Sequence, residues 1–212
     1  MNGLRHTVYS PNGDQYTGEW QNDQRHGPGT FIWKATKSKY EGDWKCGKRS
    51  GFGSYSVLNA KTGEYDKVYH GGWENDKRHS HGTYYYKKDE YYEGDWEARK
   101  RSGWGKMYFA NGNVYEGEWY EDKHDGQGML RLANENRYEG SWEKGQKHGP
   151  GKYYYLDKGQ IYEGIWVRDI PKCGTVVDYG RAAAKDSTRY PLRFLVKLKY
   201  PEGVLQEARE AF

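Results

Sequence analysis

Seven copies of one short pattern constrain the fold of this chain more than any other feature. Each copy has Tyr, then Gly two residues later and Trp four residues later, as in the Y-E-G-E-W stretch Tyr115–Trp119. About six mainly polar residues then precede a G-x-G pair such as Gly126–Gly128. The Trp residues lie 23 or 24 residues apart, with one interval of 29. A repeat of this period predicts an array of small units in place of a single globular core. The copies begin at Tyr16, Tyr40, Tyr69, Tyr92, Tyr115, Tyr138 and Tyr162.

The composition agrees with such an array. Leu, Ile, Val and Phe together make up about 13% of the 212 residues, a fraction that by itself would indicate disorder. The chain nevertheless has 22 Tyr and 9 Trp, whereas disordered chains are poor in aromatic residues. Repeats in which each unit buries a few large rings against its neighbours satisfy both observations.

The alternation within each copy predicts β-strands. In Tyr115–Trp119 the Tyr, Gly and Trp side chains alternate with two glutamates, which is the period of a half-buried strand. The G-x-G pair begins a second strand with the same period, ending in Leu130 and Leu132. The Gly between the rings leaves space for an aromatic ring to lie across the backbone. We therefore predict an all-β fold, an elongated, single-layer, twisted antiparallel sheet of tandem β-hairpins with six-residue polar connectors.

The pattern divides the chain into three regions. Residues 1–15 resemble the back half of a repeat, residues 16–175 hold the seven copies, and residues 176–212 form a C-terminal cap. In the seventh copy Cys173 and Thr175 stand where the two glycines are expected. The cap is predicted to contain a connector, an apolar strand and a short helix, and its unpaired strand favours a homodimer. The cap and self-association residues are Leu192, Phe194, Val196, Leu198, Leu205 and Phe212.

Charge and cysteine content exclude several classes of function. The net charge of +4 is too small for a nucleic-acid-binding surface. Cys46 and Cys173 are far apart, which suggests a reduced, cytoplasmic protein, and no apolar run is long enough to span a membrane. His79 and His81 alone do not make a zinc site, and the paired carboxylates recur in most copies, as on a solvated strand face. We expect no catalysis, no cofactor and no metal.

The Y-E-G-E-W and G-x-G pattern at this period resembles the MORN-repeat family, over residues 16 to about 175. The layout is most similar to one small member of that family. The resemblance implies a β-hairpin array that acts as a scaffold, a cytoskeletal or ciliary component, or a membrane-associated tether, including in male germ cells or sperm vesicles. Ser80 in the third G-x-G pair and the stretch His70–Gly72 depart from the pattern. These departures put a shared ligand surface in those units in doubt.

The aromatic face of the sheet is the first candidate site. Its rings either bury one another and hold the fold, or remain open as anchors for a protein partner. The rings proposed to contact a partner are Tyr40, Trp44, Tyr92, Trp96, Tyr115, Trp119, Tyr138 and Trp142.

The basic residues that follow each Trp are the second candidate. They either form an ordinary solvated edge or touch anionic lipid or an acidic partner, and each is worth only about 1 kcal/mol near an anionic surface. The residues concerned are Lys48, Arg49, Lys77, Arg78, Arg99, Lys100 and Arg101. The leading hypothesis is a non-catalytic scaffold or adaptor that binds protein partners. The alternative is a peripheral membrane tether that binds anionic phospholipid.

Overall fold

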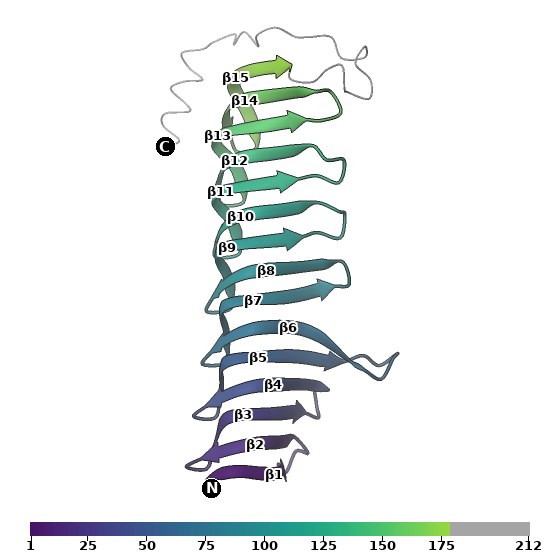
Figure 1. The fold of residues 1–212 in the computed structure, drawn as a ribbon, viewed down its shortest axis with the longest axis vertical. Coiled ribbons are helices and arrows are strands. Elements are labelled where there is room, and N and C mark those ends of the chain that lie inside the picture. The colour runs from purple at the N-terminus through teal and green to yellow at the C-terminus, as the bar shows by residue number, and fades with distance from the viewer. Residues whose placement is uncertain (179–212) are drawn as a thin grey trace. The chain divides into compact units, whose positions relative to one another are not determined.

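The computed structural model describes residues 1–178, which form fifteen β-strands and no helix (Figure 1). The strands are β1 (Gly3–Tyr9), β2 (Gln15–Gln21), β3 (Gln24–Trp33), β4 (Ser38–Lys45), β5 (Lys48–Leu58), β6 (Tyr65–Glu74), β7 (Lys77–Lys87), β8 (Glu90–Glu97), β9 (Lys100–Tyr108), β10 (Val114–Tyr120), β11 (Lys123–Arg131), β12 (Arg137–Glu143), β13 (Gln146–Tyr155), β14 (Gln160–Val167) and β15 (Ile170–Asp178). Strand order follows the chain, and the described pairings are antiparallel. The predicted all-β array of hairpins is confirmed.

The chain divides into two compact units, Met1–Gly103 and Trp104–Phe212. Strands β1 to β8 belong to the first unit, β10 to β15 belong to the second, and β9 contains the boundary.

The predicted C-terminal strand and helix, with the self-association residues from Leu192 to Phe212, lie outside the described residues and stay predictions. No helix within residues 1–178 is long and apolar enough to cross a membrane.

Two-residue turns join the strands of each hairpin, so the predicted six-residue connectors are wrong. Glu121 and Asp122 join β10 to β11 with φ angles of 47° and 69°, and Asn75 and Asp76 join β6 to β7 with φ angles of 48° and 64°. Positive φ at both positions is the signature of the type I′ turn, whose twist matches that of the flanking strands. The remaining polar residues continue the strands to the hairpin tip. Their polarity reflects exposure on a strand and not a loop.

A bulge lies where the G-x-G pair begins in the hairpins β2–β3, β4–β5, β6–β7, β10–β11, β12–β13 and β14–β15. Gly117 faces Gly128, and Trp119 faces His124, so three residues of β11 oppose one residue of β10. Gly126 lies in this bulge with φ of 91°, a conformation that favours glycine. In two other copies the position after the bulge glycine holds Pro28 or Pro150, a residue that sheets accept at bulges.

The glycine pairs make room for the tyrosines, as predicted. A Cβ on Gly128 would lie 2.3 Å from the hydroxyl oxygen of Tyr115, and a Cβ on Gly117 would lie 2.4 Å from the Cα of Gly128. The phenol therefore lies across the neighbouring strand, where any side chain would collide with it. Its hydroxyl donates a hydrogen bond of 2.9 Å to the backbone carbonyl of Glu118.

In the seventh copy, the residue that occupies the second glycine position of the G-x-G pair lies one position before the one that we predicted. Gly174, and neither Cys173 nor Thr175, faces Gly164, and the Tyr162 ring lies against Gly174. The bulge is shorter here, because Trp166 faces Pro171 while Ile165 faces Cys173. Counting residues from the Trp assumed a bulge of constant length, and the shorter bulge moves the glycine position.

Candidate functional site

Tyr and Trp rings of successive repeats alternate along one face of each unit, which we call the inner face. In the first unit Tyr40 meets Trp44 of its own repeat edge-on, with ring centroids 5.2 Å apart, and meets Trp73 of the next repeat at 5.4 Å. In the second unit Tyr138 meets Trp142 and Trp166 in the same way, at 5.3 and 5.1 Å. Edge-to-face packing is a favoured arrangement of aromatic rings. We call the Tyr and Trp rings of the seven copies the inner ring row.

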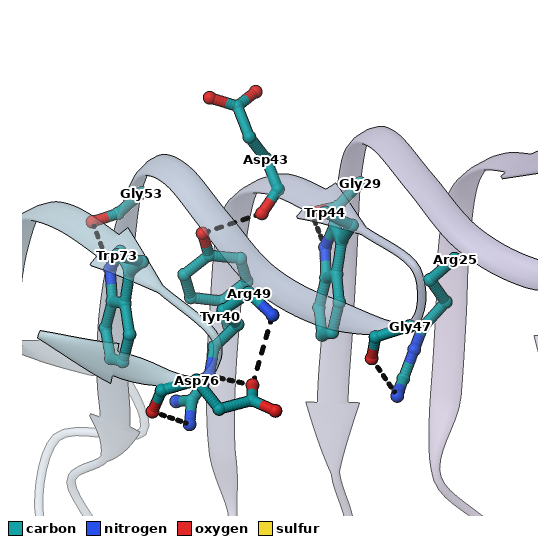
Figure 2. Close-up of polar contacts among 10 residues, drawn as sticks. All are labelled: Arg25, Gly29, Tyr40, Asp43, Trp44, Gly47, Arg49, Gly53, Trp73 and Asp76. Atoms are coloured by element: carbon teal, nitrogen blue, oxygen red, sulfur yellow. Dashed lines mark hydrogen bonds and ion pairs between the residues drawn. The ribbon is translucent and has the colours of Figure 1, made fainter.

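Hydrogen bonds fix the polar atoms of the inner ring row. The Nε1–H of Trp44 donates to the carbonyl of Gly29 in the preceding repeat at 3.1 Å, and the hydroxyl of Tyr40 donates to the carbonyl of Asp43 at 3.1 Å (Figure 2). Trp142 repeats the first bond with Gly128. In the copies between the first and the last, these rings therefore have both their apolar surface and their polar atom occupied, whereas the buried Nε1 atoms of Trp20 and Trp166 have no hydrogen-bond partner within residues 1–178.

The structure buries the eight rings that we expected to contact a partner. Their exposed fractions range from 0% for Tyr40 to 5% for Trp142. Neighbouring repeats cover them, so they hold the fold together and leave little surface for another protein. The eight rings are Tyr40, Trp44, Tyr92, Trp96, Tyr115, Trp119, Tyr138 and Trp142. Of the two alternatives, the described structure favours mutual burial.

In the first six copies, a cationic or imidazole side chain five residues after the Trp covers the inner ring row. The guanidinium carbon of Arg49 lies 4.3 Å from the ring centroid of Trp73, and that of Arg25 lies 4.5 Å from that of Trp44. Arg78 lies 4.4 Å from Trp96. Cation–π contacts of this kind are attractive, more so when they are partly desolvated. His124, which occupies the same position in the second unit, stacks on a tyrosine instead, with ring centroids 3.6 Å apart.

These side chains also join adjacent hairpin tips. Arg49 donates from its Nε and from its backbone N–H to the same carboxylate oxygen of Asp76, at 3.0 and 3.1 Å (Figure 2). Asp76 is the second turn residue of the next hairpin, and its backbone N–H donates back to the carbonyl of Arg49. Arg25 bonds in a similar way to Gly47, whose carbonyl accepts from Nη2 at 2.7 Å. The sequence signal, a basic residue five positions after Trp, was present but was interpreted as part of a solvated loop.

The basic residues proposed for lipid contact fall into two groups. Arg49, Arg78 and Arg101 are half-buried and lie near rings of the inner ring row. Lys48, Lys77, Arg99 and Lys100 are exposed at the hairpin tips.

The hairpin tips carry no excess positive charge. The seven tips, each taken as the four residues after Trp, hold eight acidic and eight basic side chains. The basic excess of the segments after Trp therefore comes from the half-buried position, which faces rings and not solvent.

Carboxylates on the opposite face have structural contacts. Asp43 accepts a hydrogen bond of 2.9 Å from the backbone N–H of Phe52, and Glu118 accepts one of 2.9 Å from that of Gln127. Both donors lie in the G-x-G segment, so the carboxylate satisfies a backbone group that the bulge frees from the ladder. Other carboxylates pair with lysines across neighbouring strands, as Glu163 does with the Nζ of Lys152 at 3.2 Å. The recurrence of these acids reflects sheet architecture.

The accessible apolar and aromatic side chains of the inner face form a second row, which the sequence analysis did not identify as a site. They follow G-x-G at every second residue. The centroids of Phe31 and Trp33 are 4.6 Å apart, and Trp33 reaches Tyr55 at 6.1 Å. Tyr86 is 44% exposed. The alternation of side chains along the strand showed that these residues share a face. Neighbouring residues in the sequence, however, do not distinguish a half-exposed ring from a buried one. This rim row consists of Phe31, Trp33, Tyr55, Tyr84 and Tyr86 in the first unit, and Leu130, Leu132, Tyr153 and Tyr155 in the second.

The titratable groups of the described residues do not gather into a reactive centre. Within residues 1–178 no group of three His, Cys, Asp or Glu side chains is placed to hold a metal ion. Burial raises the pKa of Tyr16 and of Tyr162 to about 12, and it also raises the pKa of Tyr40. These phenols are therefore neutral at physiological pH and act as hydrogen-bond donors.

Comparison with known proteins relates these repeats to a described family. The MORN-repeat family model matches residues 16–35, 40–56, 69–89, 92–114, 115–137 and 138–160. MORN repeat-containing protein 3 of Xenopus laevis is 68% identical to this chain, over 98% of this chain and 87% of that protein. The Bos taurus and Homo sapiens proteins of the same name are 56% and 55% identical, each over 100% of this chain and over 87% and 88% of their own lengths. The matches begin at the tyrosines that open the first six copies.

Proposed function

Because this chain belongs to the MORN-repeat family, whose members generally mediate protein or membrane interactions, we propose that it is a non-catalytic scaffold or adaptor that binds protein partners. The partner lies along the rim row of the inner face. The proposed setting is a cytoplasmic assembly of cytoskeletal, ciliary or male germ-cell type.

The exposure of the rim row supports this proposal. Its rings stand next to the rigid inner ring row, so their positions are set before a partner arrives. Phe31 contacts Tyr16 and Trp44 of the inner ring row, with centroids at 6.4 and 5.9 Å. Tyr and Trp rings held in place lose little conformational entropy on binding and are frequent anchors of interfaces. The rim row is therefore the surface that a partner segment uses.

The test compares exposed rings on the two faces of the first unit. Crosslinking mass spectrometry in native tissue first identifies bound proteins and the repeats they touch. Trp33→Ala and Tyr86→Ala then remove rim-row rings, and Phe52→Ala is the matched control, because Phe52 is 54% exposed and lies between the two glycines of its G-x-G pair, with its side chain on the opposite face.

The two outcomes of this test are distinct. We expect the double rim-row variant to bind its partner at least about tenfold more weakly, since ring anchors often contribute 2 kcal/mol or more each, while Phe52→Ala binds as the wild type does. Circular dichroism confirms that each variant is folded. A folded double variant that keeps every partner at wild-type affinity contradicts the proposal.

The alternative, a peripheral tether on anionic lipid, has less support from the described surface. Half-buried Arg49, Arg78 and Arg101 face rings, and the tips carry equal numbers of acidic and basic side chains. A basic surface must present its charge to the headgroups to bind them. Weak lipid contact through Lys48, Lys77 and Lys100, and the homodimer through the C-terminal region, remain proposals of lower rank.

A further inference from the structure

A small hollow opens on the inner face of the first unit at the third repeat, with lining residues from the second and fourth repeats. Its volume is about 200 Å³. Aromatic rings form its walls, among them Tyr55, Tyr69 and Tyr84, and charged residues from the ends of three successive hairpins line much of the rest. Tyr55 and Tyr84 belong to the rim row, so the hollow is continuous with the proposed partner surface.

Comparison between repeats shows that the charge of this hollow is unusual. At Arg49 and Lys147 the second turn position of the next hairpin holds a carboxylate, whereas at Arg25 and His124 it holds glycine. Arg49 pairs with Asp76 at 3.0 Å, and the Nζ of Lys147 lies 3.8 Å from Asp169. At Arg78 the same turn position holds Arg99, whose backbone carbonyl accepts from Nη2 of Arg78 at 3.0 Å. Among the second turn residues of the second to seventh hairpins, Arg99 is the one cation, and the others are aspartate or glycine.

Arg78 also has an unused donor. Its Nε is buried and has no hydrogen-bond partner among the described residues. In Arg49 the equivalent atom donates to Asp76. Within residues 1–178 no carboxylate lies within 4.0 Å of the guanidinium of either Arg78 or Arg99. The other unpaired buried donors within residues 1–178 are the neutral indole N–H groups of Trp20 and Trp166, whereas the donor of Arg78 belongs to a cation that lines a hollow. Buried donors are nearly always paired, so this one indicates a ligand that supplies the acceptor.

We propose that this hollow binds one acidic side chain, Glu or Asp, of a protein partner. The inference rests on the proposed function and names the chemistry that this part of the inner face recognises. The carboxylate takes the place that Asp76 and Asp169 hold in other repeats, accepting from Nε of Arg78 and pairing with Arg99. Arg99 is an exposed turn residue, so its side chain can turn aside to admit the ligand.

Size and wall chemistry favour a single side chain over a free metabolite. The volume is below the range of about 300–1,000 Å³ that is typical of small-molecule pockets. Its charged lining consists of Arg49, Asp76, Arg78 and Arg99, an excess of positive charge that complements a carboxylate. The ring walls suit the methylene groups of a Glu side chain and apolar neighbours in the partner segment.

The direct test follows the Arg Nε–H signals of the full-length protein by nuclear magnetic resonance. The probe is glutamate capped at both ends, titrated at constant ionic strength, with capped glutamine as the neutral control. We expect a saturable shift of the Arg78 signal with capped glutamate only. The Arg49 signal is an internal control, because that donor is already bonded to Asp76. No shift of Arg78, equal shifts of both arginines, or a response to inorganic phosphate alone overturns the proposal.

Two substitutions at one turn position separate recognition from folding. Arg99→Asp restores the pairing seen at Asp76 and Asp169, so we expect a thermal midpoint at least as high as that of the wild type and at least about tenfold weaker binding of the probe. Arg99→Gly matches Gly47 and Gly145 at the same position, suits the φ of 85° there, and should weaken binding less.

Unchanged probe binding in folded Arg99→Asp overturns the acidic-side-chain site. That result leaves the rim-row test on Trp33 and Tyr86 unaffected, so the failure of this inference is distinguishable from the failure of the proposed function.

Discussion

The phenol of Tyr115 lies so close over Gly128 that a Cβ on this glycine would be 2.3 Å from the hydroxyl oxygen and 2.7 Å from the ring carbon Cζ. Tyr40 has the same relationship to Gly53 in the first unit, and Tyr138 has it to Gly151 in the second. Each repeat therefore requires a glycine, which has no side chain, on the strand over which its tyrosine ring lies. This relationship explains why Tyr and G-x-G recur together.

Gly128→Ala should destabilise the protein strongly. The added methyl group displaces the Tyr115 ring from a fully packed position, which costs about 3 kcal/mol. Gly145→Ala is the control, because its Cβ would meet nothing within 4 Å and only its φ of 91° opposes the change, at about 1 kcal/mol. Urea unfolding measures both. A loss at Gly128 no larger than the loss at Gly145 would contradict the role of the Tyr115 ring, because Gly128 is not among the glycines with positive φ.

Asp76→Asn should weaken the contact between the third and second hairpin tips. The substitution keeps the shape and the tolerance of positive φ but removes the charge that pairs with Arg49. Since Asp76 is partly exposed, we expect a loss of about 1 kcal/mol. A double-mutant cycle with Arg49→Met gives the coupling by urea unfolding. A coupling near zero would mean that the stacking of Arg49 on Trp73, and not the ion pair, stabilises this junction.

Stability should fall steeply above pH 10. Burial raises the pKa of Tyr16 and of Tyr162 to about 12, and it raises the pKa of Tyr69 as well. Unfolded tyrosines ionise near pH 10, so between pH 10 and 12 the unfolded chain has lost protons that the folded chain keeps. Their stabilising contribution is complete below pH 10 and is lost as pH rises toward the folded pKa.

Urea unfolding at pH 9, 10 and 11 measures this effect, with tyrosinate absorbance as a simultaneous monitor of ionisation. Stability that is constant over this range, or ionisation of all the tyrosines near pH 10 without unfolding, would contradict the assignment of buried, neutral rings.

Vesicles containing phosphatidylserine or a phosphoinositide should not bind this protein strongly. The hairpin tips carry balanced charge, and the remaining attraction is screened at about 0.1 M salt. Co-sedimentation with such vesicles, compared with neutral phosphatidylcholine vesicles, measures the difference. Salt-resistant binding that Lys48→Glu, Lys77→Glu and Lys100→Glu together abolish would instead support the membrane-tether alternative.

The local pattern of the sequence determined the repeat, the strands and the family. Period-two alternation and the spacing from Tyr to Gly to Trp depend on residues within a few positions of one another, and the structure confirms the hairpins and the rings that lie across glycine pairs. Polar composition near the tips did not reveal two-residue turns, because exposed strand residues and loop residues are equally polar.

Only the tertiary structure decided which rings are accessible and which charges are free. Tyr40 is fully buried because Trp73 of the next repeat covers it, and Arg49 is held by Asp76, 27 residues away. Contacts between repeats join residues that no local pattern relates. Burial moves the candidate surface from the inner ring row to the rim row, and the exchange of a carboxylate for Arg99 becomes visible only when equivalent tips are compared in space.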